Sequence, residues 1–373
     1  MKTIRYRLGL EQRLFPEYRR PFFELLAGNC PKGFCLFAGK VQPGEGVLEA
    51  ATLQKGEWVR AENRYVFSGK TLLYHEENLL AWLESWKPQV LIVEANLRHL
   101  GLRRAIRWMH QHGGRVIGWG LGFGGNKTAF SITWQGIQKA FIQNFDVLLS
   151  YSQKGKNEYV EAGFPAERVF VASNAVSPQP KWKIPHRGKD LKRDKPTVLF
   201  VGRLLERKSV DRLIQACARI SGKFQPDLVI VGEGPERTTL EKLAFRIYPD
   251  TRFAGDLRGR KLEDAYRQAD LFVLPGTGGL AIQQAMSYGL PVITGVGDGT
   301  QSDLVRSENG WQLVSDKAEE LTDKLTSALK DPAKLRKMGE ASFKIVKNEV
   351  NLESMLESFA NAVEYAMKMD ERK

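Results

Sequence analysis

Residues 271–286, Leu-Phe-Val-Leu-Pro-Gly-Thr-Gly-Gly-Leu-Ala-Ile-Gln-Gln-Ala-Met, join a short apolar run to a helical pattern through a glycine-rich turn. The apolar run predicts a strand that is buried on both faces. At the start of the helix, the backbone N–H groups of Gly278, Gly279 and Leu280 would be open to an anion. Gln284 would point back from the first turns toward a ligand hydroxyl. The alternative is that these glycines only pack the helix onto the sheet.

The same alternation of strand and helix repeats throughout the second half of the chain. Short apolar runs, each followed by a helical pattern, predict a doubly wound parallel sheet with right-handed crossovers. The expected strands are 197–201, 227–231, 251–254, 271–274 and 291–294. The expected helices are 209–221, 235–246, 262–268, 279–288, 316–330, 332–346 and 352–369.

The first half shows a second, less regular set of such units. Strands are expected at 89–93, 115–118 and 146–150, with helices at 97–112 and 130–143. Before residue 70 the pattern is weaker, and strands near 3–8, 33–38 and 64–67 with a helix near 18–27 fit it best. The fold class is therefore α/β, with two doubly wound Rossmann-like parallel-sheet domains facing across a cleft.

Composition places the domain boundaries. Residues 178–196 contain four prolines among many charges and no periodicity, which indicates an interdomain linker. The first domain would then span 1–177 and the second 197–350. The last stretch, 351–373, would form a helix that packs back on the first domain.

Two further glycine turns follow strands of the second domain. Gly202 starts a turn that carries Arg203 and Lys208 to the beginning of the next helix. Two cations beside a helix N-terminus suit a diphosphate, although a solvated basic loop would look the same. The turn Gly232-Glu233-Gly234-Pro235 would bring its backbone close to a nucleotide, or would only join strand to helix.

These motifs carry a family resemblance. Residues from about 197 to 311 resemble the C-terminal domain of the family-four, or group 1, glycosyltransferases, which have the GT-B architecture, and 169–177 resemble the segment that closes the family's first domain. The matching motifs are, in order, Gly202-Arg203-Leu204 with Lys208, Gly232-Glu233-Gly234-Pro235, Phe253-Ala254-Gly255, Ala269-Asp270-Leu271-Phe272-Val273-Leu274-Pro275, Gln284-Ala285-Met286 with Gly289-Leu290-Pro291-Val292-Ile293, and Asn309-Gly310.

The resemblance implies roles for the second domain. Arg203 and Lys208 would bind the donor diphosphate and act as the catalytic cations, while Phe253 and Gly255 would face the nucleobase. The family also carries two glutamates eight positions apart, which contact the donor sugar and the ribose. Here Gly276 and Gln284 occupy those positions. Gln284 can still hydrogen-bond a ribose hydroxyl, whereas Gly276 cannot replace a carboxylate.

The first domain would hold the acceptor. Glu94 follows the strand at 89–93, and the loop Trp119-Gly120-Leu121-Gly122 follows the strand at 115–118. Glu94, Trp119 and Gly122 are the acceptor-side candidates. Relatives often place a histidine in this loop, but Leu121 stands there in this chain. His99 alone indicates a surface or capping residue more readily than a base.

Composition also bears on whether the chain spans a membrane, is secreted or binds a metal through cysteines. The chain of 373 residues has a formal charge of +13, and no apolar stretch is long enough to cross a membrane. The polar N-terminus does not resemble a secretory signal, and three cysteines without metal-ligand spacing indicate buried, reduced thiols of a cytoplasmic protein. Basic and aromatic residues alternate in 18–23 and 103–108, which fits either an anionic membrane surface or ordinary amphipathic helices.

The expected function is transfer of a sugar from a UDP- or GDP-sugar to a glycan or lipid-linked acceptor in cell-surface polysaccharide or lipopolysaccharide synthesis. The location would be cytoplasmic, at the inner face of the membrane if the enzyme is peripheral. Retention of anomeric configuration is implied by the family. The chain contains no Asp-x-Asp motif, so neither a metal nor another cofactor is expected. The alternatives are a silent nucleotide-sugar-binding protein, an epimerase and, without a recognition motif for it, a nucleic-acid-binding protein.

Overall fold

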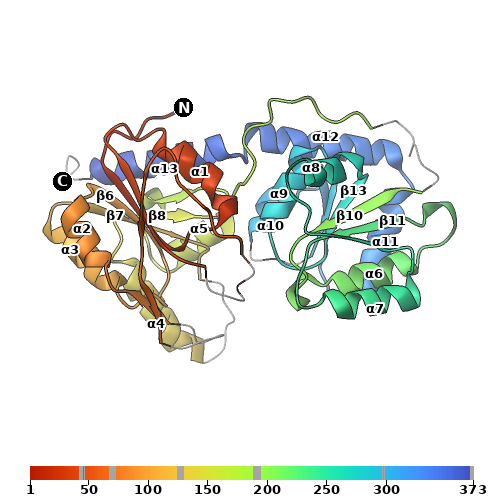
Figure 1. Cartoon of the computed structure of the whole chain (residues 1–373), viewed down its shortest axis with the longest axis horizontal. Coiled ribbons are helices and arrows are strands. Elements are labelled where there is room, and N and C mark those ends of the chain that lie inside the picture. The colour runs from red at the N-terminus through yellow and green to blue at the C-terminus, as the bar shows by residue number, and fades with distance from the viewer. Residues whose placement is uncertain are drawn as a thin grey trace. The chain divides into compact units, whose positions relative to one another are not determined.

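The computed structural model describes the chain except residues 42–44, 46, 67–72, 124–129, 188–194, 296, 298 and 370–373, and the side chains of 130–135 and 223. It divides into two compact units, Met1–Val176 with Leu352–Lys373, and Ser177–Asn351. Each unit contains one parallel sheet with helices on both faces (Figure 1). The two doubly wound α/β domains that were expected from the sequence are thus confirmed.

The sheet of the first unit has the strand order β3-β2-β1-β6-β7-β8-β9, and all its pairings are parallel. Helices α1 and α13 pack on each other, and α2 packs on α3. The strands are β1 (Leu8–Leu14), β2 (Phe34–Gly39), β3 (Glu57–Arg60), β6 (Val90–Glu94), β7 (Arg115–Gly120), β8 (Val147–Ser150) and β9 (Val169–Val171). The helices are α1 (Arg20–Ala27), α2 (Leu79–Trp86), α3 (Leu102–Gln111), α4 (Phe130–Ile142), α5 (Gln153–Glu161) and α13 (Leu352–Met367).

The first strand is the clearest error of the sequence prediction. It runs over Leu8–Leu14 rather than 3–8, and it contains two buried polar side chains, Glu11 and Gln12. These polar residues interrupt the apolar pattern that marks a strand covered on both faces. The predicted strand therefore ends at residue 8, where the observed strand begins. The strand expected at 64–67 is β4 (Asn63–Tyr65), which pairs antiparallel with β5 (Tyr74–Glu76), and residue 67 lies outside the described residues.

The second unit has the strand order β12-β11-β10-β13-β14-β15, again parallel throughout. Its strands are β10 (Thr197–Val201), β11 (Asp227–Val231), β12 (Arg252–Gly255), β13 (Leu271–Leu274), β14 (Val292–Thr294) and β15 (Gly310–Gln312). Its helices are α6 (Val210–Ala218), α7 (Arg237–Ile247), α8 (Gly259–Gln268), α9 (Leu280–Ser287), α10 (Thr300–Leu304), α11 (Ala318–Leu329) and α12 (Pro332–Asn348). The expected strands and helices of this half are confirmed within a few residues.

The described part of the segment expected as a linker packs on the second unit. The guanidinium of Arg187 donates to the carbonyls of Ala269 and Tyr288 at 2.8 and 2.9 Å, and Trp182 Nε1 donates to Ser287 O at 3.2 Å. In all, Arg187 donates to four backbone carbonyls, which include those of Gly289 and Tyr266. These bonds fix the stretch because they satisfy carbonyls at the ends of α8 and α9. Residues 178–187 therefore form part of the second unit, and 188–194 lie outside the described residues.

Helix α13 completes the core of the first unit. It packs on α1, β7, β8 and β9. The Phe359 ring lies 4.9 Å from the Phe22 ring and 5.0 Å from the Trp119 ring, in edge-to-face geometry with both. All three side chains are buried, so α13 supplies apolar contacts that the first 176 residues lack.

The two basic, aromatic segments are helical, and each has buried apolar side chains. Phe22 and Phe23 are buried in α1, and α3 buries Leu102, Ala105, Ile106 and Met109 against the sheet while its arginines face solvent. The apolar faces are thus occupied by the core. Among the described residues, no helix has the length and apolar character needed to span a membrane. The three cysteines are buried and unpaired, as expected.

Replacing Phe359 by alanine tests the assignment of α13 to the first unit. We expect Phe359→Ala to lower the free energy of unfolding by about 3–5 kcal/mol, because a buried aromatic ring leaves a cavity. The measurement is urea unfolding followed by tryptophan fluorescence, since six of the eight tryptophans lie in the first unit. Phe245→Ala, at a side chain that is 84% exposed, should change the value by less than about 0.5 kcal/mol. Equal effects of the two changes would contradict the assignment.

Candidate functional site

The turns after β10 and β11 lie against each other at the carboxyl edge of the second sheet. Gly202 N donates to Val231 O at 3.0 Å, and Leu204 N donates to Glu233 O at 2.8 Å. A Cβ atom on Gly232 would lie 2.0 Å from Gly202 O, and one on Gly234 would lie 2.2 Å from Leu204 O. Both positions therefore require glycine, and their close approach fixes the turn that carries the half-buried Arg203.

A cation and an uncapped helix start meet beside this turn. The Lys208 ammonium donates to Thr277 O, and a Cβ on Gly278 would lie 2.4 Å from Lys208 Nζ. Helix α9 begins directly after Gly279 and has no side-chain cap. Thr277 N also donates to Arg207 O at 3.0 Å. Lys208 is thus held over the N-terminus of α9, where cation and helix dipole both favour an anion.

Within the described chain, the N–H groups of Gly278, Gly279 and Leu280 have no hydrogen-bond acceptor. The prediction that these amides are available to a ligand is consistent with this finding. Backbone amides at a helix start bind phosphate oxygens well, because they point along the axis and cannot swing away.

Gly276, which stands where the family carries a glutamate, has no room for a side chain. A Cβ there would lie 2.1 Å from Arg207 O and 2.6 Å from Lys208 Cα. Gly276 O accepts a hydrogen bond from Gln301 Nε2 at 3.1 Å. The segment that carries Lys208 therefore occupies the space that a glutamate side chain at position 276 would need. The packing of this segment excludes any side chain there.

The remaining donor candidates lie at the same edge. Gln284 is half-buried on α9, and its Oε1 accepts from the Tyr266 hydroxyl at 3.4 Å. Phe253 is half-buried on β12, and Gly255 O accepts from Gly232 N at 2.8 Å. The structure therefore brings the turns after β10, β11, β12 and β13 together at one end of the sheet, as expected for strands of a doubly wound domain.

The acceptor-side candidates have different environments. Glu94 ends β6, and its amide donates to Glu11 Oε2 at 3.1 Å. Burial raises the pKa of Glu94, while nearby Arg13 counteracts the rise. Gly122 has a positive φ of 99°, and its amide donates to the Tyr159 hydroxyl at 3.1 Å. Gly122 therefore makes a turn that packs on α5, and its N–H is already satisfied.

Trp119 corrects the sequence prediction. Its side chain is only 1% exposed and packs between Phe22, Phe359 and Tyr151, under the guanidinium of Arg19 at 4.9 Å. Successive side chains of a strand point to opposite faces of the sheet. The Trp119 side chain, in β7, points to a face that is buried in the core. Trp119 supports the sheet edge and does not present its ring to a ligand.

Sequence reasoning missed a buried polar cluster in the first unit. His99, expected at the surface or as a cap, is 3% exposed and stacks on Tyr74 with the ring centroids 4.9 Å apart. Glu11 and Glu76 lie on its two sides. The three residues come from distant segments, so no spacing could reveal them. The one available signal was a glutamate within the apolar pattern of Leu8–Leu14.

Comparison with known proteins agrees with this geometry. Two parallel-sheet Rossmann-like units define the GT-B fold class, and sucrose-phosphate synthase from Thermosynechococcus elongatus shares that fold with a TM-score of 0.72. At 19% identity, the alignment covers 97% of this chain and 99% of the synthase chain. Residues 183–345 match the family model for glycosyl transferases group 1.

Two curated relatives extend this result. A GDP-mannose-dependent monoacylated alpha-(1-6)-phosphatidylinositol monomannoside mannosyltransferase of Corynebacterium glutamicum is 25% identical over 76% of this chain and 75% of its own length. A GDP-mannose-dependent alpha-mannosyltransferase of Mycolicibacterium smegmatis is 40% identical over 33% of this chain and 31% of its own length. Residues 183–345 thus match the group 1 glycosyltransferases, and the chain is similar to these two mannosyltransferases.

A methyl group at residue 276 tests the packing of the Lys208 segment. We expect Gly276→Ala to destabilise the protein by about 1–3 kcal/mol, because the new Cβ would overlap the backbone of 207–208. Thermal unfolding measures the loss. The control is Gly136→Ala, at an exposed position of α4 with no atom within 4 Å of the added Cβ, which should be neutral or slightly stabilising. An unchanged midpoint for Gly276→Ala would show that the segment is not held there.

Proposed function

We propose that this glycosyltransferase takes its sugar from a nucleoside diphosphate donor bound at the carboxyl edge of the second unit. The observation that supports the proposal most is the position of Lys208 over Gly278 at the open start of α9. The turn of Arg203 meets the turn of Gly232 beside it. Two fixed cations and three available amides match the charge and oxygen count of a diphosphate.

The same groups would promote the chemical step. When the bond between sugar and phosphate breaks, negative charge develops on the departing diphosphate. Arg203, Lys208 and the amides at the α9 start would stabilise that charge without moving, because packing already holds their backbones. Gly255 and Phe253 lie next along the edge, where they would border the nucleobase. Gln284 would offer its amide to the ribose.

The donor sugar would be bound without the family's first glutamate. Because no side chain fits at Gly276, the sugar hydroxyls would meet backbone groups of 276–279 instead. We propose a GDP- or UDP-hexose as donor and place GDP-mannose first, since both curated relatives described above carry that dependence in their names.

For the acceptor we propose a glycan or a lipid-linked glycan in cell-surface polysaccharide synthesis, with retention of anomeric configuration. The support is the relative whose name specifies a phosphatidylinositol mannoside acceptor. The exposed arginines of α3 add a basic face that suits an anionic lipid surface, which would place the enzyme peripherally at the cytoplasmic face of a membrane. Neither a cofactor nor a donor-bound metal is part of this proposal.

The direct test combines a donor screen with a transfer assay. Stabilisation by GDP, UDP and ADP and by their sugars identifies the base, because ligand binding raises the unfolding midpoint by mass action. Labelled donor is then incubated with acceptor lipid extracts. Labelled lipid product supports the proposal. Nucleotide binding without turnover would favour the silent binding protein, and an altered free nucleotide sugar would favour an epimerase.

Removing either cation should weaken donor use. We expect Arg203→Ala and Lys208→Ala each to lower kcat/KM for the donor by about tenfold or more, equivalent to about 1.4 kcal/mol. Arg246→Ala provides the control, since that exposed cation ends α7 at the opposite edge of the sheet. Unchanged kinetics in both cation variants would refute the diphosphate site.

A further inference from the structure

Three metal-ligating side chains converge in the interior of the first unit. Glu11 comes from β1, Glu76 from β5 and His99 from the segment after β6. His99 Nδ1 lies 3.8 Å from Glu11 Oε1, and His99 Nε2 lies 3.9 Å from Glu76 Oε2. The histidine and both carboxylate side chains are buried. The cluster lies beside β1, an inner strand of the first sheet, and is remote in sequence from every predicted donor residue.

The polar atoms of this cluster lack partners. Among the described residues, neither ring nitrogen of His99 makes a hydrogen bond, and the oxygens of Glu76 and Oε1 of Glu11 have no partner outside the cluster. The Tyr74 hydroxyl is buried and also makes no hydrogen bond among the described residues. It lies near enough to Glu94, Glu11 and Glu76 for their charges to act on it. Buried polar groups are nearly always satisfied, and leaving several unsatisfied in one place is energetically unfavourable. The arrangement therefore points to something that these atoms bind.

The surrounding charges leave two carboxylates unbalanced. Arg13 and Arg19 act on Glu94, the third acid of this region, and lower its pKa against the effect of burial. Glu11 and Glu76 instead lie close to each other and to Glu94. A dication would balance the two carboxylates.

We propose that Glu11, Glu76 and His99 bind a divalent transition metal, with zinc as the reference ion. One imidazole and two carboxylates form the three-ligand set of an open zinc site, where water completes the coordination. The mixture of nitrogen and oxygen ligands suits zinc, manganese or cobalt better than calcium or magnesium, which favour oxygen alone. The ring nitrogen that does not bind the ion would donate to the neighbouring carboxylate and fix the ring.

The spacing requires little movement. One ligand atom from each residue lies within 4.8 Å of the other two. An ion at the centre of such a triangle is no more than about 2.8 Å from each atom, and zinc ligands lie at about 2.0–2.2 Å. Each side chain would therefore move by less than about 1 Å. Backbone pairing already aligns the residues, because Tyr74 N donates to Arg98 O at 3.0 Å and Leu100 N donates to Tyr74 O at 2.8 Å.

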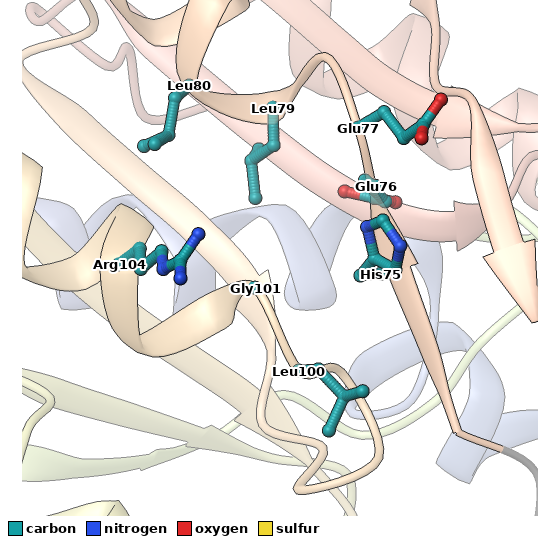
Figure 2. A pocket seen from close by; sticks show the side chains of 8 residues that line it. All are labelled: His75, Glu76, Glu77, Leu79, Leu80, Leu100, Gly101 and Arg104. Atoms are coloured by element: carbon teal, nitrogen blue, oxygen red, sulfur yellow. The ribbon is translucent and has the colours of Figure 1, made fainter. Parts of the chain in front are cut away.

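A pocket of about 490 Å³ leads toward the cluster from the surface. Figure 2 shows Glu76 between Glu77 and His75 on β5, with Arg104 of α3 on the facing side. Gly101 also lines this pocket, and a Cβ on it would lie 3.4 Å from His99 Nε2. Glu76 and Gly101 therefore lie between this pocket and the buried His99 ring.

Such an ion would join β1, β5 and the segment after β6, three parts of the chain that otherwise pair through few backbone bonds. The inference goes beyond the proposed function and does not depend on it, since the donor groups lie in the second unit. It changes the expectation from the sequence that the chain binds no metal. The rival explanation is a proton shared between Glu11 and Glu76, which would reduce the charge of the pair to −1 without an ion.

Metal retention by the tag-free full chain tests the site. The protein is stripped with EDTA, incubated separately with Zn²⁺, Mn²⁺ and Co²⁺, desalted, and analysed for metal by mass spectrometry. We expect one ion per chain for wild type and at least a tenfold loss of bound metal in Glu76→Gln and His99→Asn. Glu77→Gln and His75→Asn are the controls, because they line the same pocket outside the cluster and should retain the ion.

Two further readouts keep the proposal open to refutation. Stripping should lower the unfolding midpoint of wild type and leave that of Glu76→Gln unchanged, because only wild type loses a bound ion. Should both cluster variants fail to fold, the absorption spectrum of the Co²⁺-loaded wild type decides, since low-coordinate cobalt bound to nitrogen and oxygen absorbs more strongly than hexaaqua cobalt. Wild type that retains none of the three ions, or equal retention in Glu76→Gln, would overturn the proposal in favour of the shared proton.

Discussion

Close backbone approach at the carboxyl edge of the second sheet is the constraint on which the donor end of the molecule depends. Gly232, Gly234 and Gly276 each face a neighbouring carbonyl at a distance that admits no Cβ. The turns after β10, β11 and β13 consequently interlock through backbone atoms alone. Because backbone has few ways to relax, Arg203 and Lys208 gain fixed positions without the support of bulky side chains. The glycines thus fix the backbone of the proposed diphosphate site because they carry no side chains.

The second unit was largely predictable because local and tertiary signals agree there. Each strand is a continuous apolar run, and glycine marks the turn that follows β10, β11 and β13. The order of those motifs gave the family, the fold and the edge of the sheet that carries the candidate residues. Sequence alone could not show that Gly276 is required sterically, since its neighbours 207 and 208 are almost seventy positions away.

The first unit was less predictable because polar residues occupy its interior. Glu11 and Gln12 conceal the extent of β1, and Glu76 and His99 read as surface residues in their own segments. Trp119 was expected in the loop after a strand, but it lies within β7 and its side chain belongs to the core that α13 completes. In each case the deciding partner comes from another part of the chain, so only the assembled fold reveals the environment that determines a side chain's role.

The packing of α13 on the first unit also affects the order in which the two units can fold during translation. The second unit, Ser177–Asn351, is continuous in sequence, whereas the first needs Leu352–Met367 to finish its core. On a ribosome, domains usually mature in the order in which they emerge. Here residues 1–176 can complete their core only after α13 has been synthesised. The second unit, which lies between them in sequence, can reach its native packing first. Until α13 is made, Phe22 and Trp119 therefore lack the aromatic ring that covers them in the folded unit.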